Sequence, residues 1–268
     1  MMMKRVTGIL VTVVSIMAFL PSAHAAEAKS VIDGKRQNGQ KSALEILKRS
    51  YEYTQSLKKF SFSATTLNDD VYKDEMVFEL HHDIKLKLSR PNGIRIDIDG
   101  DAKHRRYYLY KGKFTMEDKT LGYYGEIEIP EKIDDALDAL YDRFGIRTPL
   151  ANLLYSNLTD RIMPDHEGIY FGTVLLSGKK CDYLGFYDEN REFQVWIEQG
   201  KRPLVKKFKI IDKTSPWRLS SSTTIDWKIP RKIGKSNFIF KKRKGLMEIP
   251  ILDWEENLSS TDNDGGEK

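Results

Sequence analysis

The spacing of apolar residues changes several times along the chain, and each change predicts a different element. Over residues 76–88 nearly every even position is apolar and the odd positions are mostly polar. This alternation is typical of a strand with one buried face. Residues 94–98 repeat it. Turn residues separate the further strands that the pattern predicts, at 60–67, 103–110, 113–118, 122–129, 168–176, 180–187, 191–198, 204–212 and 217–227.

Two stretches have helical spacing instead. Between residues 40 and 59 apolar side chains recur every three or four positions, which predicts an amphipathic helix. The spacing returns from Ile133 to Phe144, and Gly145 is placed to end this second helix. Thr148 and Pro149 have the form of an N-cap and a first helical residue, so a short third helix is expected there.

The number of strands constrains the fold class. About eleven strands are too many for a flat open sheet, and only two helical regions are available to cover their apolar faces. We therefore expect a mainly β (α+β) chain, a curved, half-open antiparallel β-barrel of about eleven strands. An N-terminal helix would cover it, with a central helical insertion acting as a lid over an apolar cavity. A fully packed sandwich is the alternative.

The first residues have the form of a targeting segment. Lys4 and Arg5 precede an apolar stretch over residues 6–20, followed by Pro21 and the small residues around Ala25. This order predicts a cleavable secretory signal peptide over residues 1–25, although an uncleaved anchor is the alternative. Because no Cys follows the apolar stretch, we expect a periplasmic protein without a lipid anchor. A flexible arm (26–39), one domain (40–252) and an acidic disordered tail (253–268) would follow.

Composition excludes several classes of protein. Of the 268 residues, 40% are hydrophobic and one is a cysteine, which argues against a disordered chain, a disulfide scaffold and a structural zinc site. Cys181 is expected to be a small buried side chain. His82 interrupts the apolar face of the longest strand, where a hydrogen-bonded core or rim histidine is expected. With no catalytic motif present, we expect no enzyme activity, no cofactor and no metal.

Several stretches resemble a family of predicted bacterial periplasmic proteins of unknown function. These stretches are residues 43–47 with 57–62, 90–97, 133–138 with 143–146, 149–155, and 178–184 followed by 194–198 and 202–204. The resemblance covers about residues 40 to 230. The family is similar to the LolA-like lipoprotein-carrier superfamily, whose fold is an incomplete antiparallel barrel with helices over an apolar cavity. The resemblance implies lipid or lipoprotein handling and a role in outer-membrane biogenesis, with no catalytic residues to carry over.

A cavity of this kind would be lined by apolar strand faces and covered by apolar helix residues. Ordinary core is the alternative for each of these residues, so the cavity is predicted from the set rather than from any single residue. The cavity candidates are Phe62, Phe78, Leu80, Ile84, Ile96, Tyr108, Tyr110, Phe186 and Trp196. The lid candidates are Leu137, Leu140, Phe144, Leu150, Leu153 and Leu154.

A basic segment near the C-terminal end is a candidate surface for anionic partners. Between residues 228 and 244 there are eight Lys and Arg side chains and no acidic residue. We expect Lys241, Lys242, Arg243 and Lys244 to contact anionic lipid headgroups. A solvated face balanced by the acidic tail is the alternative, and export argues against nucleic acid.

These patterns together predict a periplasmic, non-enzymatic carrier or binding protein. Its ligand would be a lipid, an acyl chain or a lipidated protein held in an apolar cavity. The alternative is an envelope sensor or scaffold that binds another protein with the same half-barrel. An enzyme is the third alternative, which a cluster of titratable groups around one pocket would favour.

Overall fold

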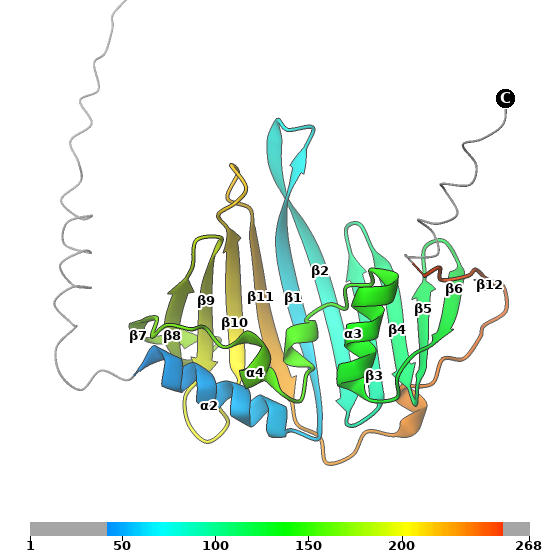
Figure 1. Cartoon of the computed structure of the whole chain (residues 1–268), viewed down its shortest axis with the longest axis horizontal. Coiled ribbons are helices and arrows are strands. Elements are labelled where there is room, and N and C mark those ends of the chain that lie inside the picture. Colours follow the sequence, from blue (N-terminus) through cyan, green and yellow to red (C-terminus); the bar gives the residue numbers. More distant parts are fainter. Residues whose placement is uncertain (1–41, 254–268) are drawn as a thin grey trace, which may run out of the picture. The chain divides into compact units, whose positions relative to one another are not determined.

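The computed structural model describes residues 42–253, and their strands form one sheet. The twelve strands of this part of the chain lie in the order β12-β6-β5-β4-β3-β2-β1-β11-β10-β9-β8-β7 (Figure 1). The strands are β1 (Lys59–Tyr72), β2 (Met76–Ser89), β3 (Gly93–Gly100), β4 (His104–Tyr110), β5 (Lys113–Asp118), β6 (Tyr123–Glu128), β7 (Ile169–Leu176), β8 (Lys179–Tyr187), β9 (Arg191–Glu198), β10 (Val205–Asp212), β11 (Ser220–Lys228) and β12 (Met247–Glu248). Neighbours pair antiparallel, except that β12 pairs parallel with β6.

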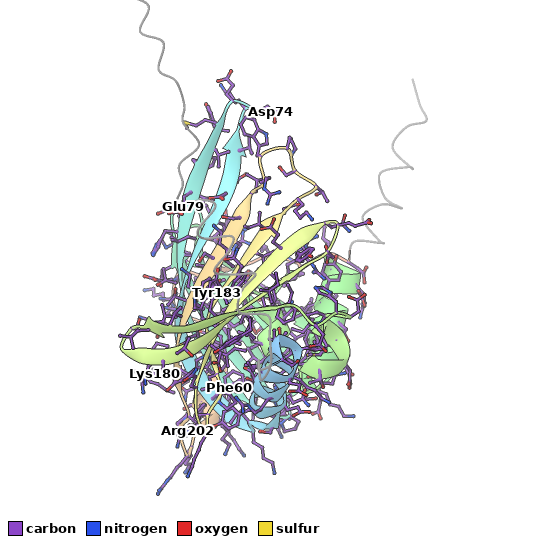
Figure 2. The ribbon with its side chains drawn as sticks, turned by 90° about the vertical axis from the view of Figure 1, so that its left-hand side faces the viewer. Phe60, Asp74, Glu79, Lys180, Tyr183 and Arg202 are labelled. Carbon is purple, nitrogen blue, oxygen red and sulfur yellow. The ribbon has the colours of Figure 1, made fainter. Side chains whose placement is uncertain are left out.

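Helices cover one face of this curved, open sheet, as Figures 1 and 2 show from two sides. They are α2 (Ala43–Ser56), α3 (Ile133–Phe144) and the short α4 (Leu158–Ile162), with a 3-10 turn η1 (Ala151–Leu153) between α3 and α4. A second 3-10 turn, η2 (Lys235–Asn237), follows β11. The expected mainly β, half-open barrel with an N-terminal helix and a central helical insertion is confirmed.

Local sequence explains where the two long helices begin and end. The Oγ atom of Ser42 accepts a hydrogen bond from the backbone N–H of Glu45 at 3.1 Å, which caps the start of α2. Leu57 is extended and stops this helix. Gly145 adopts a left-handed conformation (φ 60°) at the end of α3, as its position predicted.

The hydrophobic core lies between the sheet and these helices. In β2 the even residues Ile84, Leu86 and Leu88 are buried, while Lys85 and Lys87 between them are exposed. From the helices, residues such as Leu47, Leu137 and Leu140 pack against the same face. The predicted alternation therefore sets which side of the sheet faces the helices.

The other face of β3–β6 is also covered, by the segment that follows β11. Phe240 contacts Tyr108 and Tyr124, with ring centroids 5.6 and 5.0 Å apart. Phe238 stacks on Tyr110 at 6.4 Å and lies so close to Gly93 that a Cβ there would be 2.9 Å from its ring. This segment then pairs with β6 as β12.

Two details of the central insertion differ from expectation. Thr148 does not cap a helix, because Leu150 is the N-cap of η1 and adopts a left-handed conformation (φ 56°). The expected short helix is a single 3-10 turn, and the helical segment α4 follows it.

Outside this insertion, the sequence pattern did not predict strand β12.

Several predicted segments lie outside the described residues. These are the signal peptide (1–25), the arm (26–39) and the tail beyond Asp253. Within residues 42–253, none of the helices has the length and apolar character that a membrane span requires.

Candidate functional site

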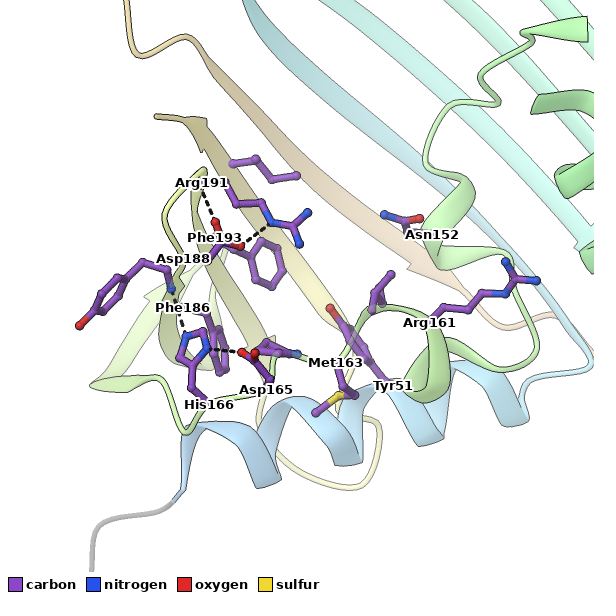
Figure 3. Close-up of a pocket in the computed structure, with 14 residues that line it drawn as sticks. Tyr51, Asn152, Arg161, Met163, Asp165, His166, Phe186, Asp188, Arg191 and Phe193 are labelled. Atoms are coloured by element: carbon purple, nitrogen blue, oxygen red, sulfur yellow. Dashed lines mark hydrogen bonds and ion pairs between the residues drawn. The ribbon is translucent and has the colours of Figure 1, made fainter. Parts of the chain in front are cut away.

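A pocket of about 480 Å³ opens between α2, the η1–α4 region and the β8–β10 part of the sheet (Figure 3). Segments far apart in the sequence meet here. The lining residues are Tyr51, Asn152, Arg161, Ile162, Met163, Pro164, Asp165, His166, Phe186, Tyr187, Asp188, Arg191, Phe193 and Ile210. Its volume lies within the range of about 300–1,000 Å³ that is usual for small-molecule sites.

Aromatic and aliphatic side chains form one wall of the pocket, and polar and charged side chains form much of the rest. Phe186 is buried and stacks on Phe193, with ring centroids 6.2 Å apart, and Ile210 extends this surface along β10. Tyr51 of α2 is also buried, and its hydroxyl points away from the helix into the pocket (Figure 3). Burial raises the pKa of Tyr51 far above its ordinary value, so its phenol stays neutral.

His166 attaches the loop over residues 163–168 to the end of β8. Its Nε2 atom accepts a hydrogen bond from the backbone N–H of Tyr187 at 3.3 Å. Since Nε2 is the acceptor, the Nδ1 atom carries the proton and donates to Asp165 at 3.0 Å. The loop leaves the site at Gly168 (φ +69°), where a Cβ would lie 2.4 Å from the ring of Phe186. Only glycine fits this close approach.

Neighbouring side chains hold Arg161 of α4 in place. Its guanidinium donates to both carboxylate oxygens of Asp138, at 3.0 and 2.7 Å, and lies 3.9 Å from the ring centroid of Tyr155. The hydrogen bond from Arg161 lowers the pKa of Asp138 below its ordinary value. Burial, together with Asp138, raises the pKa of Tyr155 to about 12. This cluster fixes α4 against α3.

A second charged pair lies in the turn between β8 and β9. Asp188 Oδ1 accepts hydrogen bonds from the backbone N–H groups of Asn190 and Arg191, each at 2.8 Å. Its Oδ2 accepts from Arg191 Nε at 3.1 Å. The Asn190 N–H is the main cause that lowers the pKa of Asp188. The side chains of Arg191 and Asp188 are 68% and 45% exposed, so this pair belongs to the mouth of the pocket.

The imidazole of the pocket is already engaged by neighbouring groups. His166 is engaged by an adjacent carboxylate and a backbone amide, and the lining residues include no serine, threonine or cysteine nucleophile beside it. In residues 42–253 no group of three or more His, Cys, Asp or Glu side chains could hold a metal ion. Cys181 is buried outside the pocket, as expected, and burial raises its pKa.

A family model matches residues 43–252 of the chain, which is most of its length. The chain belongs to this family, described as "Predicted periplasmic protein (DUF2092)". The resemblance to a periplasmic family of unknown function is thus confirmed. The sequence has no match among curated proteins.

Solved structures with a similar arrangement share little sequence with this family member. An uncharacterized conserved protein from Thermus thermophilus is 11% identical, with a TM-score of 0.44, over 78% of this chain and 98% of that one. The lipoprotein LppX from Mycobacterium tuberculosis is 11% identical, with a TM-score of 0.41, over 72% and 98%. A LolA superfamily protein from Nitrosomonas europaea is 11% identical, with a TM-score of 0.33, over 75% and 99%.

The expected cavity residues fall into four groups. Phe186 lines the pocket. Phe62, Ile84 and Ile96 are buried in the core, and Phe78 and Leu80 are half-buried where β2 extends beyond the helices. Tyr108, Tyr110 and Trp196 lie on the opposite face of the sheet, where Trp196 stacks on Tyr183 with centroids 4.4 Å apart and Lys207 lies over its ring.

The expected lid residues do not line this pocket. Leu137, Leu140, Leu153 and Leu154 are buried in the core, and Phe144 and Leu150 pack against it. His82, expected to be hydrogen-bonded, is half-buried, and its Nδ1 atom has no hydrogen-bond partner within the described structure.

The expected anionic contacts are exposed, but two of them already have partners. Arg243 forms an ion pair with the buried carboxylate of Glu117, and Lys242 lies 5.1 Å from the ring centroid of Tyr124. Lys241 and Lys244 are exposed beside them.

Sequence patterns did not identify the polar residues of the pocket. Arg161 lies in a helix of five residues, and His166, Asp188 and Arg191 lie in or beside loops, where no periodicity applies. The available signal was the Pro164 to Gly168 loop that leads from the helical insertion back into the sheet.

Proposed function

We propose that this protein is a periplasmic, non-catalytic carrier or binding protein that holds an acyl chain in the pocket between α2, α4 and β8–β10. The chain would belong to a lipid or to a lipidated protein. The observation that carries the proposal is a preformed pocket of about 480 Å³ with one wall of aromatic and aliphatic side chains and with charged groups at its mouth. Membership of a family described as periplasmic supports the compartment.

The energetics of acyl burial support this assignment. Each methylene removed from water contributes about 0.8 kcal/mol, so about ten of them contribute roughly 8 kcal/mol before the costs of association. That gain needs no catalytic group and few polar contacts.

The direct test is native mass spectrometry of the mature protein, purified from its own periplasm without detergent and then extracted with organic solvent. We expect a bound species in the mass range of a fatty acid or phospholipid. A clean apo mass, with no shift after incubation with lipid vesicles, would contradict the proposal.

A matched pair of variants places the ligand in the pocket. Ile210→Trp would fill space beside Phe193 and reduce the fraction of ligand-bound protein severalfold, since Ile210 is 36% exposed and its replacement can be accommodated in the fold. Ile211→Trp is the control, because the adjacent residue of β10 points to the opposite face. Equal ligand occupancy in both variants would show that the ligand binds elsewhere.

Contact with anionic membrane headgroups through Lys241, Lys242, Arg243 and Lys244 is part of the proposal, as a surface for delivery. Lys241 and Lys244 are the exposed members without the aromatic and carboxylate contacts of their neighbours.

One observation favours a scaffold function as the second candidate. The β1–β2 hairpin extends beyond the rest of the sheet, with Asp74 at its tip (Figure 2). Tyr72 and Met76 beside the tip are 51% and 56% exposed. A clean apo mass would shift the assignment toward protein binding through this hairpin.

A further inference from the structure

We propose that the pocket selects a lipid with one acyl chain and a zwitterionic head group that carries both a phosphate and an ammonium. This inference rests on the proposed function and specifies the class of its ligand. Three observations carry it. They are the volume of the pocket, the charges of its lining residues, and the ion pair of Arg191 and Asp188 at its mouth.

The volume of the pocket limits the number of chains. A methylene group occupies about the volume of a water molecule, roughly 30 Å³. A pocket of about 480 Å³ therefore holds about sixteen such groups, which is one ordinary acyl chain. A second chain would need about the same volume again.

The charges around the pocket do not favour an anion. Its lining contains two arginines, Arg161 and Arg191, and two aspartates, Asp165 and Asp188. Arg161 is already bound through two hydrogen bonds to Asp138, so an anion would have to compete with that carboxylate. A free fatty acid would therefore bring a further negative charge near Asp165 and Asp188, with Arg191 alone to compensate it.

The exposed pair at the mouth matches a zwitterion. The guanidinium of Arg191 and the carboxylate of Asp188 are adjacent, with Nε and Oδ2 3.1 Å apart (Figure 3). A guanidinium is a good partner for phosphate, and a carboxylate accepts hydrogen bonds from ammonium. A phosphate-ammonium head group would satisfy both, while its chain extends along Phe193 and Ile210 toward Tyr51.

The test is isothermal titration of the mature, delipidated protein with four lipids below their aggregation limits. These are 1-palmitoyl-lysophosphatidylethanolamine, palmitate, monopalmitoylglycerol and a short-chain diacyl phosphatidylethanolamine. We expect the first to bind about tenfold or more tightly than the other three, because only it offers one chain and both head-group charges.

A charge-removing variant tests the role of the pair. Asp188→Asn keeps an oxygen for the backbone N–H groups of the turn and removes the carboxylate charge, so the preference for the lysophospholipid over monopalmitoylglycerol should fall severalfold. Asp212→Asn is the control, because Asp212 also accepts from a turn N–H, of Thr214, and does not line the pocket.

Each outcome has a defined meaning. Palmitate or monopalmitoylglycerol binding as tightly as the lysophospholipid would overturn the head-group assignment, and the diacyl lipid doing so would overturn the single chain. An unchanged preference in Asp188→Asn would also overturn the assignment. Binding of none of the four lipids would count against the proposed function itself.

Discussion

Gly168 ends the loop over residues 163–168 at a position that has no room for a Cβ atom. Its left-handed backbone (φ +69°) disfavours a side chain, and an added Cβ would lie 2.4 Å from the ring of Phe186 and 2.8 Å from the carbonyl oxygen of Gly185. We expect Gly168→Ala to lower the free energy of unfolding by about 2 kcal/mol or more and to displace Phe186 toward the pocket. Urea denaturation measures the first effect and ligand affinity the second.

Gly178 provides the matched control for this substitution. It has a similar backbone conformation (φ +76°), but a Cβ there would meet nothing within 4 Å. Gly178→Ala should therefore cost only the backbone strain, about 1 kcal/mol, with no change in ligand affinity. Equal effects of the two substitutions would show that the contact with Phe186 does not matter.

Arg90 links two elements that border the pocket to the β2–β3 turn. It donates from Nε to the carbonyl of Leu57 at 3.2 Å, from Nη1 to Leu154 at 2.7 Å and from Nη2 to Tyr155 at 2.9 Å. Burial lowers its pKa, which Asp134 beside it partly offsets. The end of α2 and the η1–α4 connection are thus held to the start of the β2–β3 turn by one side chain.

We expect Arg90→Met to lower the free energy of unfolding by about 3 kcal/mol, because buried carbonyl groups lose their donor while the apolar volume is largely kept. Arg49→Met on the exposed side of α2 should change it by less than about 0.5 kcal/mol. Chemical denaturation of both variants makes the comparison. Equal stability of Arg90→Met and the unsubstituted protein would exclude Arg90 as a structural link.

Elements with a clear period could be predicted, and those without one could not. The alternation over 76–88 and the helical spacing from Ile133 to Phe144 both correspond to observed elements, because burial of one face imposes the period. Strand β12 has two residues and α4 has five, which is too short for any period to show. The parallel pairing of β12 with β6 depends on the path of the distant C-terminal segment.

At the scale of the whole molecule, both faces of the sheet are covered over β3–β6, and this limits what the sequence can predict about the core. Tyr107 and Tyr108 are adjacent and both buried, one against the helices and the other beneath Phe240. Apolar character alone therefore could not tell which aromatic residues face the helices. The pocket was beyond prediction for a related reason, since Tyr51, His166 and Arg191 meet only in the folded chain.

The face of the sheet opposite the helices also carries a network of charged side chains, which links the segment after β11 to β3–β5. Asp97 accepts two hydrogen bonds from Arg95 and one from Arg106. Arg106 lies 3.6 Å from Glu117, the buried carboxylate that also binds Arg243. Burial acts to raise the pKa of Asp97, but the two arginines hold it below its ordinary value.

This lowered pKa predicts how stability depends on pH. Because Asp97 binds its proton less readily in the folded chain, its stabilising effect is fully present above the unfolded pKa of about 3.9 and is lost as the pH falls through the lower folded value. We expect Asp97→Asn to lower the free energy of unfolding by about 2 kcal/mol at pH 7 and to flatten its decline below pH 4. Asp74→Asn, at the exposed hairpin tip, should leave both unchanged. Urea titrations at pH 7 and about pH 3 compare the three proteins, and an acid-dependent loss of the same size in Asp97→Asn would rule out this network as its source.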